Sequence, residues 1–402
     1  MSLTFHLRSR RSFSPLNRQS GAVLLIVLWT SALMTILVTA MAGRVKLAAT
    51  SVLNYNSAAE NAAKVMTTLY SAEAEIMLEL MPRPIGEVLE TNSEGEIRNP
   101  AHRFDGRILV PSYPIPPNME LRVFSHAGKI NLNRIPRRNM QLLIEKRLGG
   151  QEADPEKVQS LLDAWTDWTD LNDLSGLDGA ESEYYLDLDP PFSPRNNPEL
   201  DTVEEISHIR GFAELFAGLN LDAAFTVYGN NRTVNLNLAT REAMLLLPGL
   251  NSELADEIIA YRLRDDINTR SELGEIIPFE NLAELSTWVG NETSSFYSVF
   301  VSMRNEIDSL QEVILKRATE SKFDPLTYYT NFEDYLSDDK YFRNIMSETF
   351  VDGSAVKQGL VSDRQAYMEI IEVNNFNQLP RVYKVDPYGR LPTVLVLIEE
   401  VD

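Results

Sequence analysis

Residues 22–43 read AVLLIVLWTSALMTILVTAMAG and follow directly on Gly21, without one charged side chain. A helix needs about 20 apolar residues to cross a bilayer core, so this stretch predicts a membrane-spanning helix. Residues 1–21 contain four arginines and no acidic residue. By the positive-inside rule this basic flank places the N-terminus in the cytoplasm, although Arg44 and Lys46 reduce the asymmetry. The rest of the chain would then be exported.

Three interpretations of this segment compete. It could be a plain uncleaved anchor, or a cleaved signal peptide, since Ala40-Met41-Ala42 fits the small-x-small cleavage pattern. Against the latter, the apolar region exceeds the usual 7–15 residues of a signal peptide. In the third interpretation, a short basic leader that ends in Gly21 and leads directly into the helix resembles a type IV prepilin. The resemblance implies that prepilin peptidase removes Met1–Gly21 and leaves Ala22 as the new N-terminus.

The helix is predicted to continue well beyond the apolar segment. Residues 44–81 contain no Pro or Gly, and Pro82 ends the pattern. Over residues 22–81 one helix would be about 90 Å long at 1.5 Å per residue. Its second half carries an apolar stripe at helical spacing, which predicts packing against a globular head. The stripe consists of Ala58, Ala62, Val65, Leu69, Ala72, Ile76 and Leu80.

Strand-like segments flank a long helical region. Residues 136–290 have mostly helical patterns, and apolar or alternating runs on either side of them predict strands. An α+β class follows, with an antiparallel sheet interrupted by an inserted α-helical domain. The predicted strands are Arg107–Val110, Glu120–Phe124, Ser298–Met303, Gln311–Lys316 and Thr393–Ile398.

The chain therefore divides into six predicted parts. They are a leader (1–21), a long helix (22–81, transmembrane over 22–43), the first part of the head (82–135), the inserted domain (136–290), further head strands (291–320) and a C-terminal extension that ends in a strand (321–402). The extension is not explained by the rest of the pattern. It is either an insertion before the last strand or an appended segment.

An internal repeat marks the insertion. INLN at 130–133 recurs as VNLN at 234–237, and in each copy a methionine, Met140 or Met244, lies nine residues after the first Asn. Two similar units, each with an Asn turn before a helix, would explain this repeat physically.

The second unit extends into a helix-hairpin-helix-like segment at residues 240–264. Its helices would be joined at Pro248-Gly249, with Asn251 where DNA-binding hairpins have a second glycine. Acidic side chains surround the hairpin and would repel a phosphate, which favours a structural role over DNA binding. They are Glu242, Glu253, Asp256 and Glu257.

Three features together resemble one family, the type II secretion minor pseudopilins called general secretion pathway protein K. Prepilins usually carry Glu at the fifth mature position, but the fifth residue after Gly21 is Ile26, and K pseudopilins lack that Glu. GKINLN at 128–133 and YGNNRTVNLNLAT at 228–240 are also similar to K-type segments. The resemblance covers roughly residues 15–320.

This resemblance implies a type IV pilin-like fold with a large inserted α-helical domain, and no enzymatic activity. It implies processing and N-methylation by prepilin peptidase, and a single-pass inner-membrane protein with its bulk in the periplasm. The implied partners are the I- and J-type minor pseudopilins at the pseudopilus tip, the inner-membrane secretion platform and secreted substrates. The alternatives are a type IV pilus minor pilin and a membrane-anchored DNA-binding protein.

The most acidic stretch, AWTDWTDLNDLSGLDGAESEYYLDLD at 164–189, is a candidate Ca²⁺ site. Carboxylates around a Gly-containing loop suit a cation that takes six to eight oxygen ligands, although the spacing is not that of an EF-hand. The alternative is a solvated acidic loop. K pseudopilins are similar here and bind Ca²⁺ in the inserted domain, which implies a structural ion. The candidate ligands are Asp167, Asp170, Asp173, Glu181 and Glu183.

Composition excludes several function classes. The net charge is -21, and the +4 of residues 1–21 leaves -25 for the rest, which argues against non-specific nucleic-acid binding. The absence of cysteine excludes disulfides and thiolate metal sites, and four scattered histidines argue against a His-based metal centre. No P-loop, GxSxG, HExxH or dinucleotide motif is present, so an enzyme is not expected.

Overall fold

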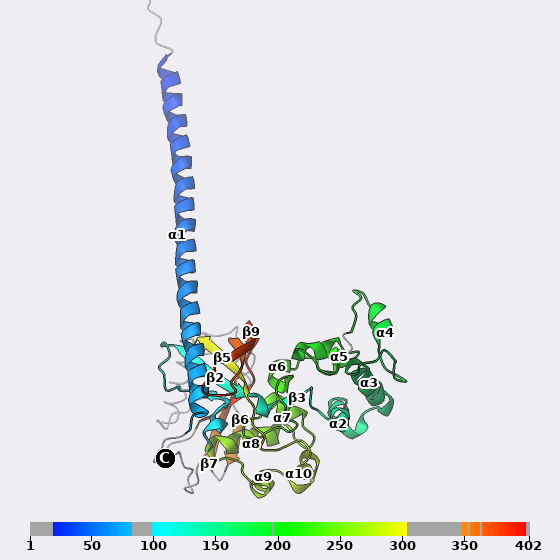
Figure 1. Cartoon of the computed structure of the whole chain (residues 1–402). Coiled ribbons are helices and arrows are strands. Elements are labelled where there is room, and N and C mark those ends of the chain that lie inside the picture. The colour runs from blue at the N-terminus through cyan, green and yellow to red at the C-terminus, as the bar shows by residue number, and fades with distance from the viewer. Residues whose placement is uncertain are drawn as a thin grey trace, which may run out of the picture. The chain divides into compact units, whose positions relative to one another are not determined.

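The chain divides into two units between Ala63 and Lys64, each described here by itself. Figure 1 shows the computed structural model. It describes residues 19–82, 99–194, 197–303, 347–351, 354–361 and 364–398. The leader up to residue 18 and the predicted strand Gln311–Lys316 lie outside these ranges.

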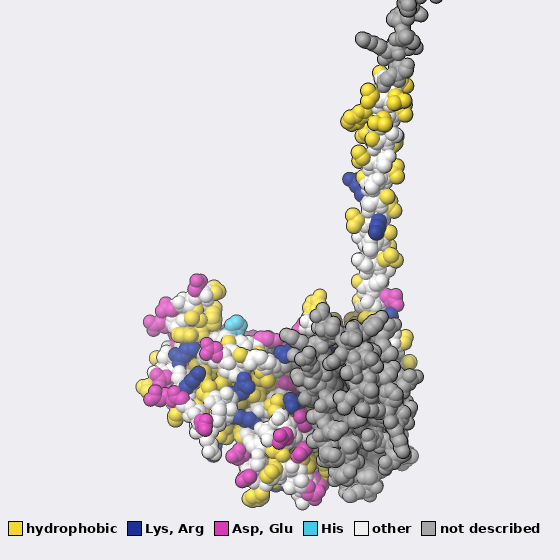
Figure 2. Space-filling view, turned by 180° about the vertical axis from the view of Figure 1, so that it is seen from behind, with side chains coloured by type: hydrophobic (Ala, Val, Ile, Leu, Met, Phe, Trp, Pro, Cys, Tyr) yellow, Lys and Arg dark blue, Asp and Glu magenta, His cyan; other side chains and the backbone are white. Residues whose placement is uncertain are grey.

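Helix α1, Gln19–Glu79, runs unbroken from the first unit into the second. Residues 22–63 of this helix are exposed, and apolar side chains cover the part nearest its N-terminus (Figure 2). Among the described residues, α1 alone is long and apolar enough to cross a membrane. The predicted long N-terminal helix is confirmed, and Gly21 and Ala22 lie near its start.

Five antiparallel strands form the main sheet of the second unit, in the order β1-β2-β5-β8-β9. The last turns of α1 pack on one face, where Leu69, Ala72 and Ile76 are buried against apolar side chains of the sheet. The predicted stripe therefore packs only from Val65 to Ile76, and its outer members Ala58, Ala62 and Leu80 are exposed. The strands are β1 (Asp105–Ile108), β2 (Met119–Ser125), β5 (Phe296–Met303), β8 (Gln365–Glu372) and β9 (Arg381–Arg390).

The opposite face of the main sheet carries a second apolar cluster, which includes Phe124, Phe300 and Met368. A separate antiparallel sheet has the order β10-β7-β6. Its strands are β6 (Ser347–Val351), β7 (Ser354–Val361) and β10 (Val394–Ile398). Val394 of β10 joins the apolar cluster on the main sheet, so this small sheet is tied to the head.

The C-terminal part of the chain differs from the predicted extension over 321–402. Strands β8 and β9 pair with β5 and with each other, and so complete the main sheet. The final strand exists as predicted, but it belongs to the small sheet. β9 gave no sequence signal because most of its side chains are exposed, so apolar and polar residues do not alternate along it.

The inserted domain lies between β2 and β5, as the α+β prediction requires, and has a large apolar core of its own. A parallel two-stranded pair, β3 (Ile130–Asn131) with β4 (Phe225–Thr226), opens it. The helices are α2 (Arg137–Arg147), α3 (Pro155–Trp168), α4 (Ser182–Leu186), α5 (Phe212–Leu215), α6 (Leu221–Ala224), α7 (Arg241–Leu246), α8 (Ser252–Arg264), α9 (Arg270–Ile276) and α10 (Phe279–Leu285). The 3-10 helices of the described residues are η1 (Pro100–Arg103), which precedes β1 in the head, and η2 (His126–Gly128), η3 (Gly150–Glu152) and η4 (Val203–His208).

The repeated Asn segments form the same structure twice. In each, the second Asn exchanges two hydrogen bonds with one distant backbone residue, Asn133 with Leu200 and Asn237 with Ile267. All four distances lie between 2.8 and 3.0 Å. A helix follows each segment, α2 after the first and α7 after the second. The predicted repeat of an Asn turn before a helix is therefore present in the fold.

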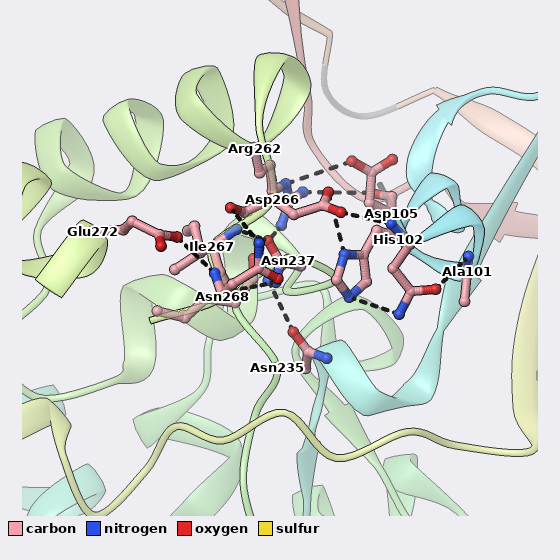
Figure 3. A network of polar contacts seen from close by, with 12 residues as sticks. Ala101, His102, Asp105, Asn235, Asn237, Arg262, Asp266, Ile267, Asn268 and Glu272 are labelled. Atoms are coloured by element: carbon pink, nitrogen blue, oxygen red, sulfur yellow. Dashed lines mark hydrogen bonds and ion pairs between the residues drawn. The ribbon is translucent and has the colours of Figure 1, made fainter. Parts of the chain in front are cut away.

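A polar network joins α8 to the first strand of the head (Figure 3). The buried guanidinium of Arg262 donates to the carbonyls of Leu236 and Ala239 at 2.9 and 2.6 Å. Its Nε lies 3.6 Å from Asp105 Oδ2 on β1. Arg262 thereby holds the second Asn segment and the edge of the sheet together. A buried charge is stable only when it is satisfied in this way.

Candidate metal site

The candidate site begins at the C-terminal end of α3. Asp154 caps the start of this helix by accepting from the Glu156 amide at 3.0 Å, and Pro155 occupies the first helical position, where a missing N–H costs nothing. One side of α3 is apolar and buried, through residues such as Leu161 and Trp165. This packing fixes the last turn, from which Asp167 projects into the loop that follows.

Three of the five predicted ligands converge. One carboxylate oxygen each of Asp167, Asp170 and Glu181 lies within 4.8 Å of the others. The loop turns back onto α3 because the Gly176 amide donates to both carboxylate oxygens of Asp167, at 3.1 Å each. A Cβ at Gly179 would lie 1.7 Å from Asp167 Oδ2, so this close approach requires glycine. Figure 2 shows acidic side chains gathered on the inserted domain.

The electrostatics of the cluster are unfavourable without a cation. Glu181 is 3% exposed, and its Oε1 has no hydrogen-bond partner within the described residues. Burial, together with the negative charges of Asp167, Asp170 and Asp173, raises the pKa of Glu181 to about 7. Burial also raises the pKa of Asp167, although the backbone amides of Gly176 and Ala180 oppose this shift. A hard cation would supply the missing partner and relieve the repulsion, so the donor set fits Ca²⁺.

The other two predicted ligands are placed differently. Asp173 is exposed, and hydrogen bonds from the side chain of Ser182 and from its backbone amide, the latter at 3.3 Å, lower the pKa of Asp173. It ties the loop to the start of α4 beside the cluster of three. Glu183 is exposed on α4 and is not a member of that cluster. The structure therefore assembles Asp167, Asp170 and Glu181 and leaves Glu183 at the surface.

Most of the aromatic residues around the loop are buried in the apolar core. Trp165, Trp168 and Tyr185 are at most 6% exposed, and the rings of Trp168 and Tyr185 meet edge to face at 5.1 Å. The fourth, Tyr184, is 38% exposed and lies against Arg210. All three buried rings belong to the apolar core of the inserted domain, where Trp165 contacts Phe212 and Trp168 contacts Tyr185.

A second buried polar cluster was not predicted. The His126 ring contacts the hydroxyls of Thr226 at 2.7 Å and Ser298 at 2.9 Å, and it is fully enclosed. Lys129 donates to Ser298 Oγ at 2.8 Å and to the Asp222 carbonyl at 2.7 Å. Burial lowers the pKa of both His126 and Lys129, the latter to about 8. The sequence signal was a His and a Lys directly beside the first Asn segment.

The helix-hairpin-helix-like segment is built as a structural hairpin. The glycine at its turn, Gly249, has φ +80°, and a Cβ added there would lie 2.5 Å from the Asn281 carbonyl oxygen. Asn251, at the position of the second hairpin glycine, accepts from the Leu254 amide and caps α8. Asp256 pairs with Arg241 across the hairpin at 2.7 Å. The turn glycine, the cap of α8 and this ion pair all stabilise the hairpin itself.

The comparisons with known proteins match the inserted domain. Residues 128–220 match the family described as type II secretion system (T2SS), protein K, and residues 229–283 match the helix-hairpin-helix motif. No curated protein is similar to the chain in sequence. A solved chain of the GspK-GspI-GspJ complex from the type 2 secretion system of enterotoxigenic Escherichia coli aligns with a TM-score of 0.41 and 11% identity. That alignment covers 83% of this chain and 98% of the solved one.

The protein K match begins at the Gly128 that opens the first Asn segment, and it includes the acidic loop. It agrees with the family resemblance found in the sequence and supports a minor pseudopilin role in type II secretion.

The raised pKa of Glu181 predicts a pH dependence of stability when divalent cations are chelated. The folded chain binds a proton on the Glu181 carboxylate more tightly than the unfolded chain does. The stability that this protonation contributes is fully present below about pH 4.5 and is lost as the pH rises through about 7. Glu181→Gln cannot titrate, so its free energy of unfolding should exceed that of the wild type increasingly from pH 4.5 to 8. Chemical denaturation of the detergent-solubilised chain with EDTA measures this difference.

The matched control is Glu183→Gln, two residues away and exposed, which should follow the wild type at every pH. A difference between Glu181→Gln and wild type that stays constant across this pH range would contradict the electrostatic account of the cluster.

Proposed function

We propose that the protein is a minor pseudopilin that occupies the tip of a type II secretion pseudopilus and initiates its assembly. The observation that carries this proposal is the match of residues 128–220 to protein K, in a helical domain inserted between strands of a sheet that packs on a long helix. No catalytic function is proposed, because the sequence carries no P-loop, GxSxG, HExxH or dinucleotide motif.

The proposed partners are I- and J-type minor pseudopilins, by analogy with the solved complex. The proposed tip position has a steric reason. The inserted domain, from α2 to α10, adds a second apolar core beside the sheet and would obstruct a further subunit stacked above it. The inner-membrane secretion platform and secreted substrates complete the proposed set of partners.

The proposed location is the inner membrane, with the N-terminus in the cytoplasm and the second unit in the periplasm. The support is the uncharged segment Ala22–Gly43 behind a basic leader. Cleavage by prepilin peptidase between Gly21 and Ala22, followed by N-methylation, would leave the helix on the mature chain.

The loop between α3 and α4 is proposed to hold a structural Ca²⁺ ion. Asp167, Asp170 and Glu181 would supply oxygen ligands, and the unpartnered buried Oε1 of Glu181 is the observation that supports it. When bound, the ion would neutralise the repelling carboxylates and fix the loop against α3. The proposed role of these residues is structural: they would stabilise the fold of one end of the inserted domain.

Processing can be tested at the N-terminus. Co-expression with a prepilin peptidase should yield a chain that begins at Ala22, as read by N-terminal sequencing and intact mass. Gly21→Leu should block the cleavage, whereas a substitution within the leader, Ser20→Ala, should allow it. A mature chain that begins after Ala42 would instead indicate a conventional signal peptide.

Assembly tests the proposed function directly. The full chain, co-expressed with the I- and J-type minor pseudopilins of the same secretion system, should co-purify as a complex with one copy of each. Size-exclusion chromatography with light scattering in detergent measures its mass. A folded chain that remains separate from both partners would contradict the tip assignment.

Calcium binding should raise thermal stability. At a Ca²⁺ concentration 100 times Kd, the folded state gains about 2.7 kcal/mol relative to the chelated chain. Asp170→Asn should lose most of this gain while folding normally, because an Asn side chain still accepts the hydrogen bond that Asp170 accepts from Asn172. Glu183→Gln should retain the full gain. Equal melting temperatures of the wild type in Ca²⁺ and EDTA would exclude the ion.

A further inference from the structure

Two glutamates lie near each other where α1 packs on the main sheet. On β8, Tyr367 and Ile371 belong to the apolar face that packs against α1, and Glu369 lies between them in the strand alternation. Glu369 is therefore on the same face, and it is only 7% exposed. Glu73 of α1 is partly buried beside it, close enough for the two charges to repel.

Neither carboxylate has a cationic partner among the described residues. Within the part of the chain that the structure describes, no hydrogen bond or ion pair involves Glu73 or Glu369. Burial and the charge of Glu369 raise the pKa of Glu73 to about 7. The lysine on the neighbouring strand β9, Lys384, points to the other face, where it pairs with Asp222 at 2.8 Å and with Glu204. The pair thus remains uncompensated.

The sheet is wider than the helix that packs on it. Strands are spaced by about 4.8 Å, so five of them span roughly 19 Å, whereas a helix with its side chains is about 10 Å wide. The buried contacts of α1 come from β2, β5 and β8 and from Phe104 and Leu109 on either side of β1, and none of the buried members of that cluster lies on β9. The α1-side face of β9 therefore lies beyond these buried contacts, and together with the adjoining side of α1 it forms a strip beside the helix.

This strip is apolar and exposed. Val385 pairs with Glu369 and Val382 with Ile371, so both valines lie on the α1 side of β9, where they are 48% and 51% exposed. From α1, Met66 lies seven residues before Glu73 and so shares its side of the helix; it is 41% exposed. The two carboxylates therefore form the floor of an apolar strip between α1 and β9.

The geometry favours a helix over an added strand. β9 is the edge of the main sheet, but Pro387 lies within it and removes one of the backbone donors that a new strand would need. A register shift between Ala366 and Met368 on β8, opposite this proline, further interrupts the pairing pattern. An occupant is therefore expected to pack on the face of the strip and not to extend the sheet.

We propose that this strip, formed by Glu73, Met66, Glu369, Val382 and Val385, receives a helix of an I- or J-type minor pseudopilin that carries a Lys or Arg within its apolar face. The cation would lie between the two carboxylates, and the apolar side chains would cover the valines. Charge complementarity selects this occupant, because a purely apolar surface would leave the buried carboxylates uncompensated. The inference rests on the proposed function and adds the docking surface to it.

Two variants of the full chain test it. The double variant Glu73→Gln, Glu369→Gln removes the charges, and Val385→Asp places a carboxylate on the apolar strip. The matched controls are Glu280→Gln, exposed on α10, and Val110→Asp, which is 83% exposed just beyond β1 at the opposite edge of the sheet. Affinity for the purified I–J pair is measured in detergent by titration, and the melting temperature of each free chain is recorded.

Both test variants should bind the I–J pair at least about tenfold more weakly than the wild type, and both controls should bind equally well. The free double variant should melt at or above the wild-type temperature, since a repelling pair is removed. A photo-crosslinker at position 385 should label a helical segment of I or J that contains Lys or Arg.

Each other result counts against the inference. If both test variants bind the I–J pair as tightly as the wild type does, the docking strip is overturned and the proposed function stays intact. A crosslink to a second copy of this chain, or to a segment without a basic residue, would overturn the named occupant. No binding by the wild-type chain would contradict the proposed function itself, and a lower melting temperature of the free double variant would contradict the uncompensated pair.

Discussion

The paired hydrogen bonds of the two Asn segments are the interaction on which the inserted domain depends. Asn133 and Asn237 each bind both the N–H and the C=O of one distant residue, so each fixes a loop that has no strand partner at that point. A parallel contact precedes each of them, β3 with β4 and Val234 with Val289. Because buried backbone groups must be satisfied, these two side chains allow irregular loops to lie inside a core.

The same segments attach the inserted domain to the sheet. Next to the first lies Lys129, whose ammonium reaches Ser298 on β5, and next to the second the Ala239 carbonyl accepts from Arg262, which also faces Asp105 on β1. Both cations are buried and donate hydrogen bonds to several groups, so their removal would leave unpaired polar groups in the core. The domain is therefore held at its two Asn turns. The acidic loop after α3 lies at a distance from these anchors in the sequence and is held by α3, by α4 and by Arg210, which donates to the Asp178 carbonyl.

The sequence predicted elements whose patterns are local and missed those that depend on distant contacts. The long helix, the inserted helices and the Asn repeat were predictable because charge, periodicity and repetition appear within short windows. Asp167 and Asp170 were predictable as neighbours at a helix end. That Glu181 joins them, and that Glu183 does not, depends on the turn at Gly176 and on the glycine-only contact of Gly179 with Asp167, neither of which spacing reveals.

In the main sheet, the sequence did not predict strand β9, but strand β8 carries a signal that the sequence does show. β9 is exposed on most positions, so its place in the sheet follows only from its pairing with β8. In β8, however, Tyr367, Glu369 and Ile371 occupy alternate positions, and a carboxylate stands where the alternation calls for an apolar residue. A charge at a core-facing position destabilises the isolated subunit unless it has a partner. Such a break in the pattern, with no cation beside it among the described residues, is the sequence signal of the docking strip proposed here.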